Sequence, residues 1–213
     1  MHKPSNPCFE YAIWLSKKVI GEKIPLNKIL DQYYKEYYQK MQETLDQFNL
    51  EATSPITCKI KCDACCHYQV ASVPMEAKYI QYHAKKTLHR KQYKIVFRKL
   101  QQVREKELKI EQRFPEDIIR QARVYRRFKI TCPFLSDDRT CIIYDFRPMI
   151  CRYHNVISSS DRCYSFKEAK HVHPWKHPHL MVSDVQFQKF MSHHYLNSDS
   201  QGSLTRLLLA HAF

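Results

Sequence analysis

The residues of this chain that could do chemistry are its cysteines, and their spacing separates most of them into two groups. The first group lies in the stretch "CKIKCDACC", and the second is looser and begins well downstream. Clustered thiolates are the ligands that zinc and iron-sulfur centres prefer in proteins. The two groups are Cys58, Cys62, Cys65 and Cys66, followed by Cys132, Cys141, Cys151 and Cys163.

Eight thiols in two groups match two tetrahedral sites, or one cluster and one ion. The side chains of adjacent residues diverge, so Cys65 and Cys66 are poorly placed to share one zinc. We therefore expect Cys66 to join ligands of the second group and to connect the two loops. The alternative is that the thiols are buried as small hydrophobic groups, which is the better interpretation for the isolated Cys8.

The cysteine motifs resemble the YkgJ-type cysteine-cluster family, which is described provisionally as a zinc- or iron-chelating domain. The resemblance rests on "CKIKCDACC" and on "CPFLSDDRTCIIYDFRPMICRYH", which together make up 32 of the 213 residues. Two positions depart from the family pattern: Ala64 replaces a glycine that is often present, and "YHNV" replaces a Tyr-Pro-Phe sequence. These departures put the shape of the second loop in question and remove no ligand.

Several side chains near Cys151 are candidates to surround a metal centre. A centre of four thiolates around a divalent ion carries about −2 charge, so a nearby cation is favourable. Arg147 and Arg152 could donate to sulfur or to Asp145, and Pro148 predicts a short helix whose amides point at the site. Tyr144 and His154 complete this set of candidates. For Arg152 the alternative is a surface arginine that pairs with a carboxylate, and for Arg147, next to Pro148 and Tyr144, a structural role is the preferred interpretation.

The spacing of the cysteines does not distinguish a zinc site from an iron-sulfur cluster. Zinc would make the site a scaffold, whereas an iron-sulfur cluster would add redox or substrate-binding chemistry. The density of cysteines favours an iron-sulfur cluster slightly over zinc.

A solvated loop is the preferred interpretation of the downstream histidines, with metal binding as the alternative. These histidines are His171, His173, His177 and His179.

Composition narrows the function classes. The chain has only two glycines, which argues against glycine-rich nucleotide-binding loops. We find neither an apolar stretch long enough for a membrane span nor a secretory signal, so we expect a cytoplasmic protein without a membrane partner.

The net charge of +14 indicates nonspecific attraction to polyanions. The mixture of Arg123, Arg126 and Arg127 with Tyr125 and Phe128 could bind nucleic acid, but an ordinary helix with solvated arginines is the preferred interpretation.

The elements that must position the thiols are mostly helices. Apolar spacing predicts helices at 9–20, 27–50, 91–113, 183–196 and 202–211. Ser72 is expected to cap a helix that opens at Pro74, and Pro115 to begin another that ends near Phe128. Turn residues at 136–138 predict a small hairpin or knuckle.

The fold class that follows is mainly α, with a helical domain wrapped around two cysteine-rich loops and little or no β structure. We expect one domain over 1–213. Its predicted parts are an N-terminal helical extension at 1–55, a cysteine-cluster core at 56–165 with a basic helical insert at 75–130, and a histidine-rich loop with C-terminal helices at 166–213.

The preferred function is metal binding through a zinc or iron-sulfur centre, with a structural, redox or protein-modifying role and with a protein as substrate or partner. One alternative is an enzyme resembling flagellin lysine N-methylase, whose cysteine motif is similar, although this chain looks short for it. Another is a basic nucleic-acid-associated module with structural zinc. Whether the chain is an enzyme stays open at this level.

Overall fold

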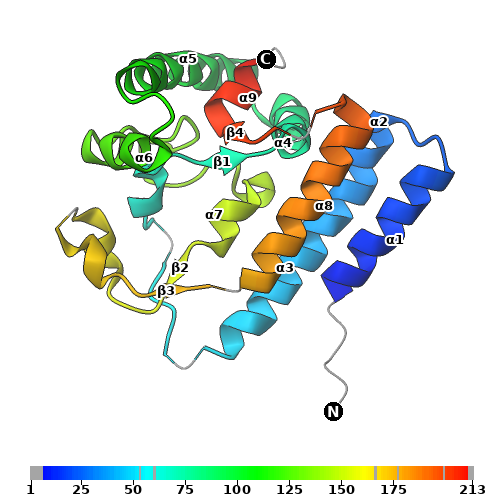
Figure 1. The fold of residues 1–213 in the computed structure, drawn as a ribbon, viewed down its shortest axis with the longest axis horizontal. Coiled ribbons are helices and arrows are strands. Elements are labelled where there is room, and N and C mark those ends of the chain that lie inside the picture. The colour runs from blue at the N-terminus through cyan, green and yellow to red at the C-terminus, as the bar shows by residue number, and fades with distance from the viewer. Residues whose placement is uncertain are drawn as a thin grey trace.

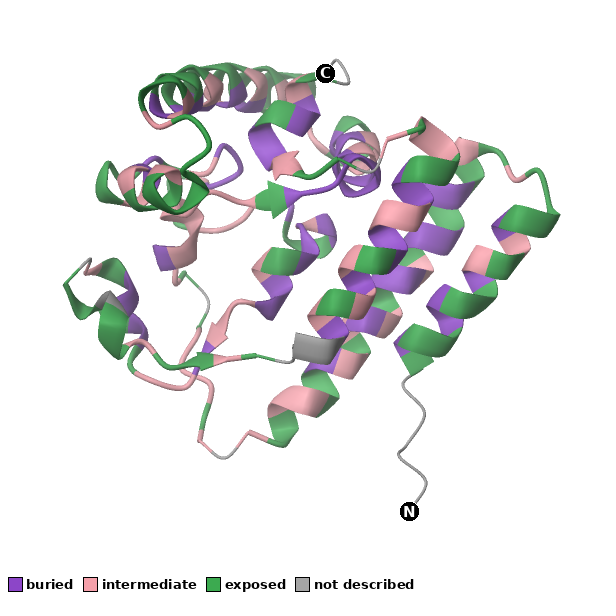
Figure 2. Ribbon diagram, in the orientation of Figure 1, coloured by how far each residue is buried: buried purple, intermediate pink, exposed green. Residues whose placement is uncertain are grey.

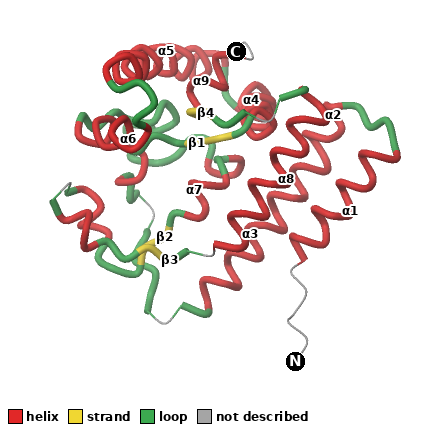
Figure 3. The backbone as a smooth tube through the Cα atoms, viewed as in Figure 1, coloured by secondary structure: helices red, strands yellow, loops and turns green. Residues whose placement is uncertain are grey.

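The structure is a computed structural model that describes residues 7–52, 54–59, 61–165, 167–176, 178–198 and 200–210. It is mainly helical, as predicted, and its strands are pairs of two-residue segments (Figure 3). None of the helices in these ranges combines the length and the apolar composition needed to cross a bilayer.

The N-terminal part is helical over most of its length. Helix α1 spans Pro7–Gly21 and buries Cys8, Tyr11 and Leu15. The next helical run comprises α2 (Leu26–Lys28), the π-helical turn η1 (Ile29–Tyr33) and α3 (Tyr34–Leu50). These bounds confirm the helices predicted from periodicity, and the π-helical turn is a local departure within the second one.

Three further helices complete the main core. They are α4 (Pro74–Thr87), α8 (Pro178–Leu196) and α9 (Leu204–Ala210). Helices α1, α3 and α8 lie side by side (Figure 1), and the buried faces in Figure 2 turn toward one another. The hydroxyl groups of Tyr34 and Tyr37 donate bonds of 2.7 Å to Gln188 and Asp184, so α3 and α8 are joined by polar as well as apolar contacts.

The helical insert contributes α5 (Arg90–Arg113) and α6 (Ile118–Arg127). They enclose a small separate core of Val103, Ile110, Tyr125 and Ile130. Helix α6 begins at Ile118 because the Asp117 side chain caps it by accepting from the Arg120 amide at 2.9 Å.

Short elements carry the cysteine loops. They are η2 (Ala64–His67), η3 (Tyr144–Phe146), α7 (Met149–Tyr153), η4 (Ser160–Tyr164) and η5 (Glu168–His171). Strand β1 (Ala71–Ser72) pairs antiparallel with β4 (Gly202–Ser203), and β2 (Asn155–Val156) pairs antiparallel with β3 (Pro174–Trp175). In Figure 1 these loops lie on the side of the molecule away from α1.

The N-cap of α4 and the starts of α6 and α8 differ from the predictions. Helix α6 begins at Ile118 and not at Pro115, because Asp117 provides its N-cap. The N-cap of α4 is Val73, because the Ser72 hydroxyl donates to the Glu76 carboxylate at 2.6 Å and does not accept a backbone amide. Helix α8 begins at Pro178, five residues before the predicted start, where proline suits the first helical turn.

Candidate metal centre

Two cysteines of the first group and one of the second lie around a small apolar cluster. Cys58, Cys62 and Cys163 gather with the buried Val156 and Ala64. The segment before Cys58 is held there because the amide of Thr57 donates to the carbonyl of Val156 at 3.0 Å. This contact brings the late thiol Cys163 to the early pair.

A backbone hydrogen bond joins the other end of the early loop to the downstream cysteines. The amide of Cys132 donates to the carbonyl of Cys66 at 2.7 Å. Cys132 and Cys141 flank the predicted hairpin, which the structure contains as a turn closed by a bridge between Leu135 and Cys141. Cys66 therefore lies beside the second cysteine group.

Backbone amides point at two of these sulfurs. The amide of Phe134 hydrogen-bonds to the sulfur of Cys132, and the amide of Ile143 does the same for Cys141. Such bonds favour the thiolate over the thiol and are typical of metal-thiolate loops. Burial opposes them and is the larger effect, since it raises the pKa of Cys132 to about 12 in the absence of a metal.

Cys151 approaches the second group from the short helix α7. Its pKa is raised well above the ordinary value by burial and then by the charges of Cys132 and Cys65, and the Arg147 guanidinium opposes this increase. Without a metal, Cys151 is therefore a neutral buried thiol. It could act as a ligand only where a cation stabilises its charged form.

Cys65 lies between the two groups. Its pKa is lowered to about 7, chiefly because the Cys66 thiol hydrogen-bonds to it, and that bond raises the pKa of Cys66. The charge of Cys65 also raises the pKa of thiols on both sides. Those thiols are Cys58 and Cys163 in one direction and Cys132, Cys141 and Cys151 in the other.

The donor set fits a thiolate-bound metal in its chemistry. All nine cysteines fall within the described ranges, and none forms a disulfide. Among the described side chains, no three His, Cys, Asp or Glu residues are gathered tightly enough to hold a single ion as they stand. The backbone thus brings the thiols into two neighbourhoods without closing a tetrahedron around one point.

The residues that were predicted to surround a metal centre make different kinds of contact with the cysteine loops. Arg147 lies over the Tyr144 ring at 4.0 Å, and its charge opposes the increase in pKa of nearby thiols. Arg152 is buried and donates to the backbone carbonyl of Asp145 and to Gln42 at 2.7 Å, so it holds the loop and not a sulfur. The His154 carbonyl lies 4.0 Å from the sulfur of Cys58.

The predicted histidine loop does not form a cluster in the part that the structure describes. His171 and His173 are exposed, and the amide of His173 donates to the Ser158 hydroxyl at 3.0 Å. His177 and the side chain of His179 lie outside the described residues. The metal-binding interpretation of this loop stays a prediction.

A charged clamp connecting the cysteine loops was missed by sequence analysis. Arg139 donates to the Asp63 carboxylate at 2.6 Å and also to the Tyr164 hydroxyl, and this hydroxyl donates to Asp63 at 2.7 Å. Asp63 adjoins Cys62, and Tyr164 adjoins Cys163. The only signal was that each residue is next to a cysteine or inside the cysteine hairpin, which does not by itself predict a contact.

Helix α6 contacts the same region through one of its arginines. Arg126 donates to the carbonyls of Cys163 at 3.3 Å and Ser165 at 3.2 Å, and it lies over the Tyr68 ring at 4.8 Å. Tyr125 is buried, while Phe128 is exposed. Tyr125 is therefore not available to stack on a base, whereas Arg123, Arg127 and Phe128 are exposed.

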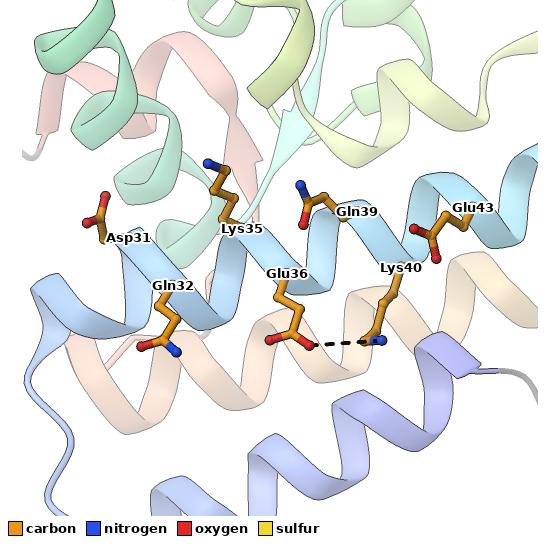
Figure 4. Close-up of a pocket in the computed structure, with 7 residues that line it drawn as sticks. All are labelled: Asp31, Gln32, Lys35, Glu36, Gln39, Lys40 and Glu43. Atoms are coloured by element: carbon orange, nitrogen blue, oxygen red, sulfur yellow. Dashed lines mark ion pairs between the residues drawn. The ribbon is translucent and has the colours of Figure 1, made fainter.

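A surface groove lies elsewhere in the fold. It has a volume of about 510 Å³ and follows η1 and α3 (Figure 4). Its lining is polar and consists of Asp31, Gln32, Lys35, Glu36, Gln39, Lys40 and Glu43. With no cysteine in its lining, the groove carries no part of the thiol groups.

A family model matches residues 57–176, which is more than half of the chain and includes all eight clustered cysteines. The model is that of the CxxCxxCC family, described provisionally as a zinc- or iron-chelating domain. The chain belongs to the CxxCxxCC family. This match confirms the resemblance predicted from the cysteine motifs. The comparisons with curated proteins and with solved structures gave no match.

Proposed function

We propose that this CxxCxxCC protein binds metal through two groups of four thiolates. The first group is Cys58, Cys62, Cys65 and Cys163, and the second is Cys66, Cys132, Cys141 and Cys151. The observation that carries this division is the 2.7 Å bond between the Cys132 amide and the Cys66 carbonyl. It places Cys66 beside the second group, while Cys163 packs with the first.

Charge around the thiols supports metal binding at these positions. Two centres of four thiolates and a divalent charge would each carry about −2. The guanidinium groups of Arg147, Arg126 and Arg139 lie around the loops, on the Tyr144 ring, the Cys163 carbonyl and the Asp63 carboxylate. These cations offset the negative charge, and the backbone amides of Phe134 and Ile143 hydrogen-bond to sulfur.

We place an iron-sulfur centre first and zinc second. The density of cysteines supports this order, because an iron-sulfur cluster is held by several thiolates at once. Zinc bound by four thiolates would be a closed tetrahedral site. When bound, a cluster would supply electron-transfer or substrate-binding chemistry, and zinc would supply folding energy.

A cytoplasmic location is part of the proposal, because a reducing compartment keeps eight thiols available as ligands. The chain's own residues then bind and shield the metal. The role of the centre in a structural, redox or protein-modifying process is a separate question. Activity on a protein substrate would be tested with that substrate and not by metal content.

Anaerobic purification followed by metal, sulfide and absorption analysis tests the proposal. An iron-sulfur centre predicts iron and acid-labile sulfide in equal amounts and broad absorption near 400 nm. Zinc predicts a colourless protein with about two ions per chain. Cys163→Ser should lose the metal of the first group, and Cys151→Ser should lose that of the second.

Cys8→Ala is the matched control, because Cys8 is a buried cysteine in α1, in the main core and outside both groups. This variant should keep the full metal content. A wild-type protein that folds normally and contains neither metal nor sulfide, or equal metal loss in all three variants, would contradict the proposal.

A further inference from the structure

Cys151 lies on helix α7, which is too short to be stable without contacts to the rest of the fold. It has five residues, Met149–Tyr153, whereas isolated helices shorter than about 12 residues are marginal in water. The direction in which Cys151 points therefore depends on the contacts that dock α7 onto the rest of the fold.

A buried carboxylate from another helix contacts the first residue of α7. Glu76 lies in the first turn of α4 and is 4% exposed. Its Oε1 accepts from the amide of Met149 at 2.7 Å. Sequence analysis predicted that the amides of this helix would point at the metal site, but the first of them is bound by Glu76.

The carboxylate of Glu76 is itself held from several sides. Its Oε2 accepts from the hydroxyl of Ser72 at 2.6 Å, and Oε1 also accepts from the hydroxyl of Tyr38 at 3.1 Å and from the amide of Gln188 at 3.4 Å. Tyr38 comes from α3 and Gln188 from α8. Through these bonds Glu76, which lies in α4, connects the start of α7 to α3 and α8 as well as to its own helix.

The other end of α7 is docked by different contacts. Arg152 donates to Gln42 at 2.7 Å, and the hydroxyl of Tyr153 lies 3.3 Å from the sulfur of Met41. These contacts are to α3. At the N-terminal end of α7 the Met149 side chain is buried in the main core, and Glu76 binds the Met149 amide. Rotation about the anchored C-terminal end would carry Cys151 away from its partners.

We propose that Glu76 is a positioning residue that fixes α7 so that Cys151 joins Cys66, Cys132 and Cys141 in the second thiol group. This inference rests on the proposed division into two groups. Partners that orient metal ligands from outside the coordination sphere typically change metal affinity by about 10- to 100-fold when they are removed. The first group, which does not use α7, should keep its affinity.

The test compares three variants. Glu76→Leu removes the acceptor, whereas Glu76→Gln keeps an acceptor oxygen for the Met149 amide. Glu107→Leu is the control, because Glu107 is also a buried glutamate, 2% exposed, and it bonds Ser203 and Arg104 away from the thiols. The two leucine variants should lose similar stability.

Co²⁺ titration of the reduced, metal-free protein is the first readout, because thiolate-bound Co²⁺ absorbs visible light. Wild type, Glu76→Gln and Glu107→Leu should show two binding phases. Glu76→Leu should show one unchanged phase and one weakened by about 10- to 100-fold. Equal phases in Glu76→Leu and wild type, or equal weakening in both leucine variants, would overturn the proposal.

Alkylation of metal-free protein, followed for each cysteine by mass spectrometry, is the second readout. Glu76→Leu should raise the rate at Cys151 relative to Cys163 by several-fold, and Glu107→Leu should leave this ratio unchanged; an unchanged ratio in Glu76→Leu would overturn the proposal. Wild type that takes up no Co²⁺ would refute the proposed function, yet the alkylation ratio would still decide the role of Glu76.

If Glu76→Leu does not fold, Ser72→Ala replaces it. This variant removes only the 2.6 Å bond to Oε2 and so loosens the carboxylate. A weakened second Co²⁺ phase in Ser72→Ala would support the proposal, and an unchanged phase would overturn it.

Discussion

The backbone amide of Cys132 donates a 2.7 Å hydrogen bond to the carbonyl oxygen of Cys66. A contact between the last cysteine of the early loop and the first of the second group makes the two loops parts of one structural region. The Cys66 thiol also hydrogen-bonds to its neighbour Cys65, whose charge acts on thiols of both groups.

Metal removal should loosen the first thiol group much more than the helical core. The apolar cluster there consists of three buried residues, Ala64, Val156 and Cys163, which is too little to stabilise a loop region alone. We expect amide exchange at 61–67 and 155–165 to rise at least about tenfold after chelation, as for local opening. Helix α3 should change little. Hydrogen-exchange mass spectrometry measures both, and equal increases in the two regions would refute this prediction.

Breaking the clamp at Arg139 should lower stability. Arg139 has a φ of 65°, a conformation that Asn tolerates, so Arg139→Asn removes the bonds to Asp63 and Tyr164 with little added backbone strain. Because the arginine is about half exposed, we expect a small but measurable decrease in the free energy of unfolding. Lys129→Asn is the control, since Lys129 is an exposed cation with a φ of 47°. Denaturant titration should show a change below about 0.5 kcal/mol there.

The three arginines of α6 should separate into two classes. Arg126 bonds the Cys163 and Ser165 carbonyls, whereas Arg123 and Arg127 are exposed. We expect Arg126→Ala to lower the Tm by about 2–4 °C, which corresponds to about 1 kcal/mol in a chain of this size. Arg123→Ala and Arg127→Ala should leave the Tm nearly unchanged but elute earlier from heparin in a salt gradient. A lower Tm in Arg123→Ala or Arg127→Ala, with an unchanged Tm in Arg126→Ala, would contradict this prediction.

Asp184 should make stability fall as the pH rises. Its pKa is raised to about 7 by burial and by the charge of Glu76, although bonds from Tyr37, Gln188 and Tyr153 oppose this. The folded protein therefore binds a proton that the unfolded chain releases near its usual pKa of about 3.9. The stabilisation is complete below about pH 4 and is lost as the pH rises through about 7, by up to about 4 kcal/mol.

Asp184→Asn tests this linkage, because the amide cannot titrate and still offers an oxygen to the Tyr37 hydroxyl. Urea unfolding at several pH values between 4.5 and 8.5 should show a smaller decline with pH in the variant. Parallel curves for the variant and the wild type would contradict the assigned pKa. Glu76 also has a raised pKa through burial, so some decline should persist in the variant.

Much of this protein was predictable from local patterns. The apolar spacing in "PLNKILDQYYKEYYQKMQETLDQF" predicts the helical run that the structure contains at α2, η1 and α3. The spacing of Cys58, Cys62, Cys65 and Cys66, with the downstream hairpin cysteines, predicts the family and its metal-binding chemistry, which the match over 57–176 bears out at that level. Both patterns depend on residues close in sequence, and local geometry controls them.

Only the tertiary structure decided which residues support the thiols. Glu76 and Met149 are 73 positions apart, and Asp63 and Arg139 are 76 apart. Nothing in either local stretch distinguishes a carboxylate that binds a distant amide from one that faces water. Arg126 shows the same difficulty, because adjacent arginines on one helix point in different directions and only packing determines which one meets the Cys163 carbonyl. Spacing along the chain therefore predicted the candidate ligands, and the packing of distant helices determined which residues contact the loops that carry them.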